Sequence, residues 1–172
     1  MNNPQEDPMY KIMLVDDEEN ILKSLNRLLK TEKRWEIELY TSAIDALKRA
    51  NTTIFDVVIS DCMMPDMDGL EFLSQLRQLQ PDAMRILLTG SVNIETLMSA
   101  INKACAFRFI TKPWEDALLL SAIWDALWFR DIIVENRMLA EKVREQESDI
   151  MYITDFLKEQ NIDEEKYRRN RR

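Results

Sequence analysis

The chain has 172 residues, a net charge of −8 and no histidine. The lack of histidine excludes a His-ligated metal site, a nucleophile paired with histidine and a phosphohistidine on this chain, and the acidic balance disfavours nucleic acid as a partner. Two cysteines, Cys62 and Cys105, are too few for a disulfide framework, so we expect a cytoplasmic protein with reduced thiols.

Short apolar runs alternate with amphipathic stretches from residue 11 to about residue 115. The apolar runs suit buried parallel strands and lie at 11–15, 35–39, 54–60, 85–89 and 107–111. The stretches between them carry apolar side chains at helical spacing and lie at 19–30, 42–50, 70–79 and 94–101. A further helix is expected after Pro113. This alternation predicts an α/β sheet of parallel strands with helices on both faces.

Polar residues of complementary type fall at the carboxyl ends of four of these strands. Asp16 and Asp17 end the first strand, Asp61 the third and Thr89 the fourth, while Lys112 follows the fifth. In such sheets, this edge is where ligands bind. Crowded carboxylates repel one another unless a cation joins them, and an all-oxygen site without histidine or cysteine favours Mg²⁺. A lysine and a hydroxyl beside that cation suit a phosphoryl group, which an aspartate can accept as an acyl phosphate.

Each of these residues has an ordinary explanation when it is taken alone. The acidic run 16–19 would cap a helix and complement its dipole, and the other three residues would be unremarkable in a loop. Their joint placement at the ends of separate strands is what favours a phosphoryl site.

The only two glycines of the chain lie in the loops at this same edge. Gly69 follows the loop 65–68, and Gly90 follows the fourth strand directly. Glycine this scarce is expected to mark unusual backbone geometry or a close approach of the backbone.

Four motifs at these positions resemble those of the receiver domains of two-component response regulators. They are MLVDDE at 13–18, VVISDCMMPDMDG at 57–69, LLTG at 87–90 and RFITKPW at 108–114. The resemblance covers about the first 125 residues. It implies a flavodoxin-like (βα)5 fold with strand order 2-1-3-4-5. It also implies a signalling switch that catalyses its own phosphorylation and dephosphorylation, rather than a metabolic enzyme.

The resemblance implies roles for the acidic residues. Asp61 is expected to accept a phosphoryl group from the phosphohistidine of a cognate histidine kinase or phosphotransfer protein. Asp17 and Asp61 are expected to bind Mg²⁺ directly, Asp16 mainly through water, and the backbone carbonyl of Met63 is expected to complete the protein ligands.

The resemblance also implies roles at the fourth and fifth strands. Thr89 and Lys112 are expected to hold the phosphoryl oxygens, and the peptide bond between Lys112 and Pro113 is expected to be cis. Phe109 is the expected switch aromatic, which turns inward as Thr89 moves towards the phosphate. Gly90 stands where the family more often has alanine, which could loosen this loop.

The final helix is longer and more apolar than a helix that only covers a sheet. Its stretch 117–129 is apolar nearly all round, which favours a second partner over a merely apolar last helix, and it is too short to span a bilayer. Heptad spacing continues from residue 129, and a lone asparagine at an a position favours a parallel, in-register homodimer. The expected dimer residues are Trp124, Trp128, Phe129, Ile132, Asn136, Leu139, Val143, Ile150, Ile153 and Leu157.

The sequence therefore predicts four segments: a tail at 1–9, a receiver domain at 10–128, a coiled coil at 129–160 and a polar, basic tail or linker at 161–172. The predicted function is phosphorylation-dependent signalling through a dimer to an output domain or a separate partner, without a membrane or nucleic-acid contact. One alternative is a phosphorylation-independent dimeric scaffold. A second is a dehalogenase-like phosphatase, which needs a second aspartate where this chain has Met63.

Overall fold

The computed structural model describes residues 9–90 and 106–169, and the side chains as far as residue 158. The chain divides into two units, Met1–Asp131 and Ile132–Arg172. The helix expected at 94–101 lies outside the described residues. Among the helices that are described, none has an apolar stretch long enough to cross a bilayer.

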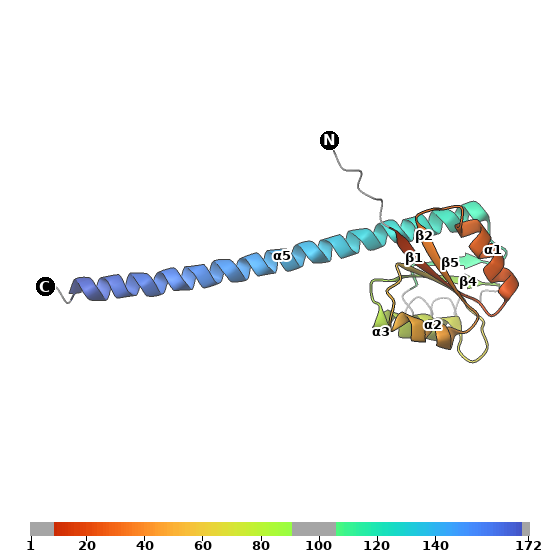
Figure 1. Cartoon of the computed structure of the whole chain (residues 1–172), viewed down its shortest axis with the longest axis horizontal. Helices are drawn as coiled ribbons and strands as arrows, with labels where there is room; N and C mark the ends of the chain where they lie inside the picture. Colours follow the sequence, from red (N-terminus) through yellow and green to blue (C-terminus); the bar gives the residue numbers. More distant parts are fainter. Residues whose placement is uncertain (1–8, 91–105, 170–172) are drawn as a thin grey trace, which may run out of the picture. The chain divides into compact units, whose positions relative to one another are not determined.

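Five parallel strands form the sheet of the first unit (Figure 1). They are β1 Tyr10–Val15, β2 Trp35–Tyr40, β3 Val57–Asp61, β4 Met84–Thr89 and β5 Arg108–Thr111. Their order is β2-β1-β3-β4-β5, which confirms the predicted topology. The pairs Val15–Ser60 and Thr89–Thr111 stand at the carboxyl ends of their strands, so these ends share one edge of the sheet.

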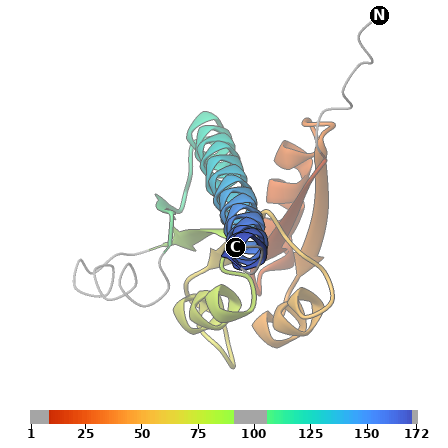
Figure 2. The same cartoon turned by 90° about the vertical axis from the view of Figure 1, so that its left-hand side faces the viewer.

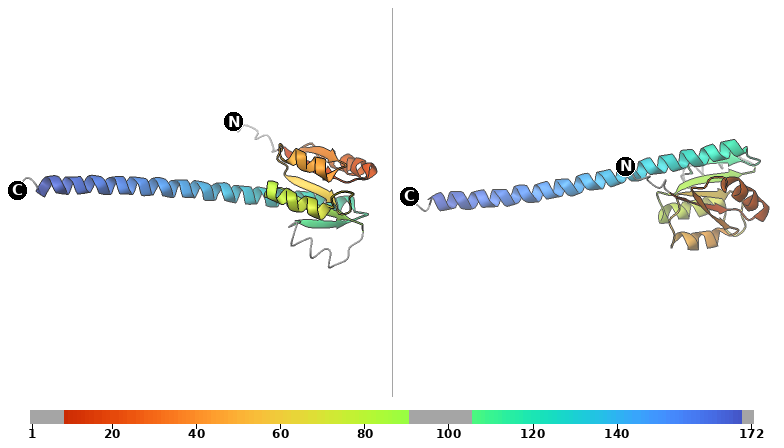
Figure 3. Two further views of the ribbon diagram at one scale, coloured as in Figure 1. Left: turned by 90° about the horizontal axis from the view of Figure 1, so that it is seen from below. Right: turned by 45° about the horizontal axis from the view of Figure 1, so that its top comes forward.

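Helices cover both faces of this sheet. They are α1 Glu19–Leu29, α2 Ala43–Ala50, α3 Gly69–Leu79 and α5 Asp116–Arg169. Figures 2 and 3 show α2 and α3 together on one face, and α1 lies with the first turns of α5 on the other. Side chains of β1 alternate between the two cores, with Ile12 in one and Met13 in the other. Both faces of the strand are therefore buried, which explains its unbroken apolar run.

The third strand begins later than the apolar run 54–60 predicted. Ile54 is 74% exposed, and the strand starts only at Val57. The cause is the buried side chain of Gln80, whose Oε1 accepts a hydrogen bond from the backbone N–H of Phe55 at 2.9 Å. The same amide donates to the carbonyl of Thr53 at 2.6 Å. These bonds hold Thr53 and Phe55 in a loop. Backbone hydrogen bonds to the neighbouring strands begin at Asp56, which donates to the carbonyl of Lys11 at 2.8 Å.

The first turns of α5 are fixed to the amino ends of the strands. Arg130 pairs with Asp56 at 2.8 Å, and both side chains are less than a fifth exposed. The hydroxyl of Tyr10 donates to Asp131 at 2.6 Å, and burial together with this bond raises the pKa of Tyr10 to about 12. These contacts anchor α5 at Arg130 and Asp131, where the first unit ends. The helix itself continues without a break to Arg169.

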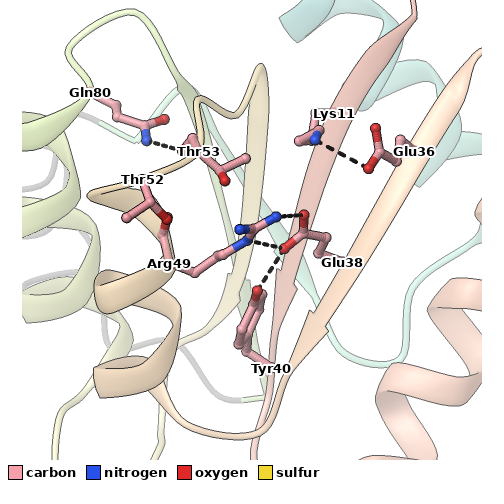
Figure 4. A network of polar contacts seen from close by, with 8 residues as sticks. All are labelled: Lys11, Glu36, Glu38, Tyr40, Arg49, Thr52, Thr53 and Gln80. Carbon is pink, nitrogen blue, oxygen red and sulfur yellow. Dashed lines mark hydrogen bonds and ion pairs between the residues drawn. The ribbon is translucent and has the colours of Figure 1, made fainter.

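An ion pair joins β2 to α2 (Figure 4). The guanidinium of Arg49 donates to both carboxylate oxygens of Glu38, each at 2.8 Å, and the hydroxyl of Tyr40 donates to one of them at 2.6 Å. The hydrogen bond from Arg49 holds the pKa of Glu38 at about 2, against an ordinary value of 4.5. A bidentate pair of this kind is stronger than a single-point surface contact.

Because the pKa of Glu38 is lowered, its ion pair stabilises the fold above pH 4.5, and this stability is lost as the pH falls towards 2. We expect Glu38→Gln to lower the free energy of unfolding at pH 7 by about 1–2 kcal/mol, after allowance for solvent screening. Urea titrations should show that the difference in free energy of unfolding between Glu38→Gln and wild type becomes smaller as the pH falls.

Glu36→Gln is the matched control. Its carboxylate is half exposed and makes one contact of 3.1 Å to Lys11, so we expect a change below about 0.5 kcal/mol. A Glu38→Gln deficit that stays constant between neutral and acidic pH would contradict the assigned ion pair.

Candidate functional site

The carboxyl edge of the sheet brings a buried carboxylate from β1 beside the lysine that follows β5. Asp16 is 1% exposed. Its Oδ1 accepts a hydrogen bond from the backbone N–H of Glu18 at 2.9 Å, and its Oδ2 lies 2.7 Å from the ammonium of Lys112. A carboxylate this deeply buried needs such partners, because desolvation alone opposes its charge.

The same ammonium reaches a second carboxylate, at the end of β3. Lys112 Nζ lies 2.5 Å from Oδ1 of Asp61, which is 6% exposed. The other oxygen of Asp61, Oδ2, accepts the backbone N–H of Met63 at 2.7 Å. Lys112 therefore bridges aspartates from two neighbouring strands, and each oxygen of Asp61 has a defined donor.

Opposing effects set the charge states of this group. Burial raises the pKa of Asp16, although hydrogen bonds from Lys112 and from the Glu18 backbone act against the rise. Burial acts to lower the pKa of Lys112, but its hydrogen bonds to Asp16 and Asp61 outweigh this, and the pKa lies above its ordinary value. Lys112 therefore keeps its positive charge between the two acids at neutral pH.

The fourth and fifth strands position the remaining predicted residues. Thr89 is buried at the end of β4, and its carbonyl accepts the backbone N–H of Lys112 at 2.7 Å. The peptide bond from Lys112 to Pro113 is cis, as predicted. Phe109 is half-buried and packs against the core on the α2 and α3 face. The structure thus brings Asp16, Asp61, Thr89 and Lys112 to one edge.

Only some of the predicted cation ligands lie close together. Asp17 is exposed, and among the described residues no three acidic, thiol or imidazole side chains come together as a metal cluster. Asp16 and Asp61 nevertheless contact one shared cation, the Lys112 ammonium. Two buried carboxylate groups that converge on one positive charge are a donor set that fits a hard divalent ion.

Gly69 is required by a close approach of the backbone. A Cβ at this position would lie 1.9 Å from the carbonyl oxygen of Asp61, and the Gly69 N–H donates to the carbonyl of Cys62 at 2.9 Å. At Gly90, a Cβ would meet none of the described residues within 4 Å, so the expected close approach is not found among them. The positive φ in this region belongs instead to Asp66, at 66°.

Two contributors to the site were missed from the sequence. They are the backbone N–H groups of Glu18 and Met63, which donate to Asp16 and Asp61. Residue type carries no signal for a backbone donor, because any residue except proline supplies one. A helix cap offered a clearer signal: Asp68 accepts the N–H of Glu71 at 2.8 Å and fixes the start of α3.

The predicted dimer residues fall into two groups. Trp124 is half-buried against Trp35, with ring centroids 5.1 Å apart, and the ring of Phe129 lies 5.7 Å from that of Phe107. Ile132 is half-buried. The exposed residues are Trp128, Phe129, Asn136, Leu139, Val143, Ile150, Ile153 and Leu157. A role for either group in a dimer stays a prediction.

Gly69→Ala should distort the loop that carries the Asp61 carbonyl, since the new methyl group must displace backbone atoms. We expect the free energy of unfolding to fall by about 2–3 kcal/mol. Gly90→Ala, at a position where no described atom lies within 4 Å of the added Cβ, should change it by less than about 0.5 kcal/mol. Equal effects of the two substitutions in urea unfolding would contradict the assigned close approach.

Comparisons with known proteins agree on the first unit. The response regulator receiver domain family matches residues 12–124. The transcriptional regulatory protein FixJ of Rhizobium meliloti is 36% identical over 66% of this chain and 55% of its own length. The hydrogenase transcriptional regulatory protein HoxA of Bradyrhizobium diazoefficiens is 31% identical over 67% of this chain, but only 24% of its own length is covered.

A solved structure gives the same result for the fold. The signal receiver domain of an HD domain-containing protein from Pseudomonas fluorescens is 35% identical, with a TM-score of 0.68. The match covers 71% of this chain and 97% of that one. The chain is therefore similar to complete receiver domains, and to roughly a quarter to a half of the curated regulators it matches.

Proposed function

The chain belongs to the response regulator receiver domain family, and from this membership we propose that Asp61 accepts a phosphoryl group from the phosphohistidine of a partner histidine kinase. The observation that carries the proposal is the bridge from Lys112 to both Asp16 and Asp61. It holds a nucleophilic carboxylate beside a fixed positive charge at the ligand-binding edge of a parallel sheet.

In the proposed reaction, a carboxylate oxygen of Asp61 attacks the phosphorus. The new O–P bond forms as the P–N bond of phosphohistidine breaks, and the imidazole nitrogen keeps the electron pair. Lys112 offsets the negative charge on the phosphoryl oxygens, and the hydroxyl of Thr89 donates a hydrogen bond to one of them. The backbone N–H of Met63 orients the carboxylate through Oδ2.

A bound Mg²⁺ is part of this proposal. Asp16, Asp17, Asp61 and the backbone carbonyl of Met63 would hold it. The ion would supply positive charge that lowers the repulsion between the carboxylates and the incoming phosphoryl oxygens. The proximity of Asp16 and Asp61 to the Lys112 ammonium supports the assignment.

The proposal predicts that Mg²⁺ and acetyl phosphate add one phosphoryl group to the wild-type chain, as measured by intact mass. Asp61→Asn should add none, because an amide is a poor nucleophile. Asp66→Asn is the matched control: it makes the same change at an exposed position of the same loop, where asparagine tolerates the positive φ. It should be phosphorylated like wild type.

Phosphorylation of Asp61→Asn to the wild-type extent would refute the acceptor assignment. If wild type gains no mass, beryllofluoride with Mg²⁺ serves as a second probe, because it binds a receiver carboxylate without a phosphodonor. Failure of both probes would favour the phosphorylation-independent scaffold.

We also propose that the switch acts through a homodimer, joined by a coiled coil of α5. The described part of the second unit is one helix. Five apolar a and d side chains, Leu139, Val143, Ile150, Ile153 and Leu157, are each more than half exposed in a single chain. A helix with such a stripe gains stability when a second helix covers it.

Sedimentation should therefore show a concentration-dependent dimer. Val143→Lys places a charge in the seam and should raise the dimer dissociation constant about tenfold or more. The free energy of association is then less favourable by about 1.4 kcal/mol or more. Met138→Lys is the matched control, because Met138 is equally exposed in the single chain but faces outward in the heptad frame. A wild-type chain that stays monomeric at every concentration would refute the proposed dimer.

A further inference from the structure

The charged residues that flank the α5 seam form a pattern of their own. In the frame with Phe129 and Val143 at a positions, Lys142 falls at g and Glu147 at the e position of the following heptad. Both are exposed. In a parallel, in-register coiled coil, a g residue faces the e residue five positions later on the other helix. Lys142 of one copy would then face Glu147 of the second.

We propose that two copies of this chain pair through residues 129–157 of α5 as a parallel, in-register coil, held in that register by reciprocal ion pairs between Lys142 and Glu147. The proposal rests on the homodimer proposed above and names its geometry. Two-fold symmetry makes each pair occur twice, so one pair of sequence positions supplies two contacts.

The two side chains need a second copy to meet. Five residues along an α-helix is a rotation of about 140°, because each residue turns about 100°. Side chains at this spacing do not share a face, unlike those three or four residues apart. An attraction between Lys142 and Glu147 therefore contributes between helices and not within one.

The other facing pairs in this register carry no like charges. They combine Trp128 with Ile133, Glu135 with Ala140, and Asp149 with Thr154. Lys142 and Glu147 also flank the layer of Gln146, a polar d residue that weakens the seam. The ion pairs thus lie beside a layer in which a polar residue interrupts the apolar packing.

Alternative alignments lose these contacts. A parallel shift by one heptad would set Asn136 against Val143 and bury an amide without an amide partner. In an antiparallel coil, g residues face g residues and e residues face e residues, so Lys142 and Glu147 do not meet.

The test uses the full chain with reversed charges. Lys142→Glu alone sets glutamate against glutamate in both pairs, and Glu147→Lys alone sets lysine against lysine. Each homodimer should dissociate about tenfold more readily than wild type at low salt. An equal mixture of the two variants restores attraction at both sites, so native mass spectrometry should find heterodimer above the statistical half.

Glu141→Lys mixed with Arg144→Glu is the matched control, because both residues face outward in the frame. That mixture should assemble at random. Random assembly of the Lys142→Glu and Glu147→Lys variants, with wild type still dimeric, would overturn the register while leaving the dimer in place. A monomeric wild type would overturn the dimer itself.

Discussion

The contact between the half-buried ammonium of Lys112 and two buried carboxylates is the interaction on which the rest of the site depends. Asp16 and Asp61 are almost fully removed from water, and two such charges on neighbouring strands repel unless a cation lies between them. Lys112 meets that need. Its place is fixed by its backbone bond to the carbonyl of Thr89 and by the strand that precedes it. The order of the strands therefore determines the electrostatics of the site.

Much of the first unit follows from periodicity in the sequence. A strand buried on both faces must be apolar throughout, so β1 and β4 were readily recognised. The start of β3 was not, because the side chain of Gln80, from another part of the chain, holds Thr53 and Phe55 in a loop. Local pattern carries no information about such a long-range hydrogen bond. A run of apolar residues alone cannot distinguish a strand from a buried loop.

The site likewise combines features that the sequence predicts with features that it does not. The residue types at the strand ends predicted which side chains meet, because parallel strands finish at one edge. One feature depended on backbone geometry that no residue type reveals, namely the backbone donors to Asp16 and Asp61. The close backbone approach predicted at Gly69 is present, since a Cβ added there would meet the Asp61 carbonyl. From Ile132 to Arg169 the chain is a single helix, and there the interpretation rests on the heptad pattern.

Of the several acidic residues at this edge, Asp61 is the one that we propose to form the acyl phosphate. The most direct measurement traps that bond. After reaction with Mg²⁺ and acetyl phosphate, borohydride reduces an aspartyl phosphate to an alcohol, and fragmentation mass spectrometry locates the reduced residue. We expect reduction at position 61 and at no other acidic residue. Reduction at position 16, 17, 66 or 68 would contradict it.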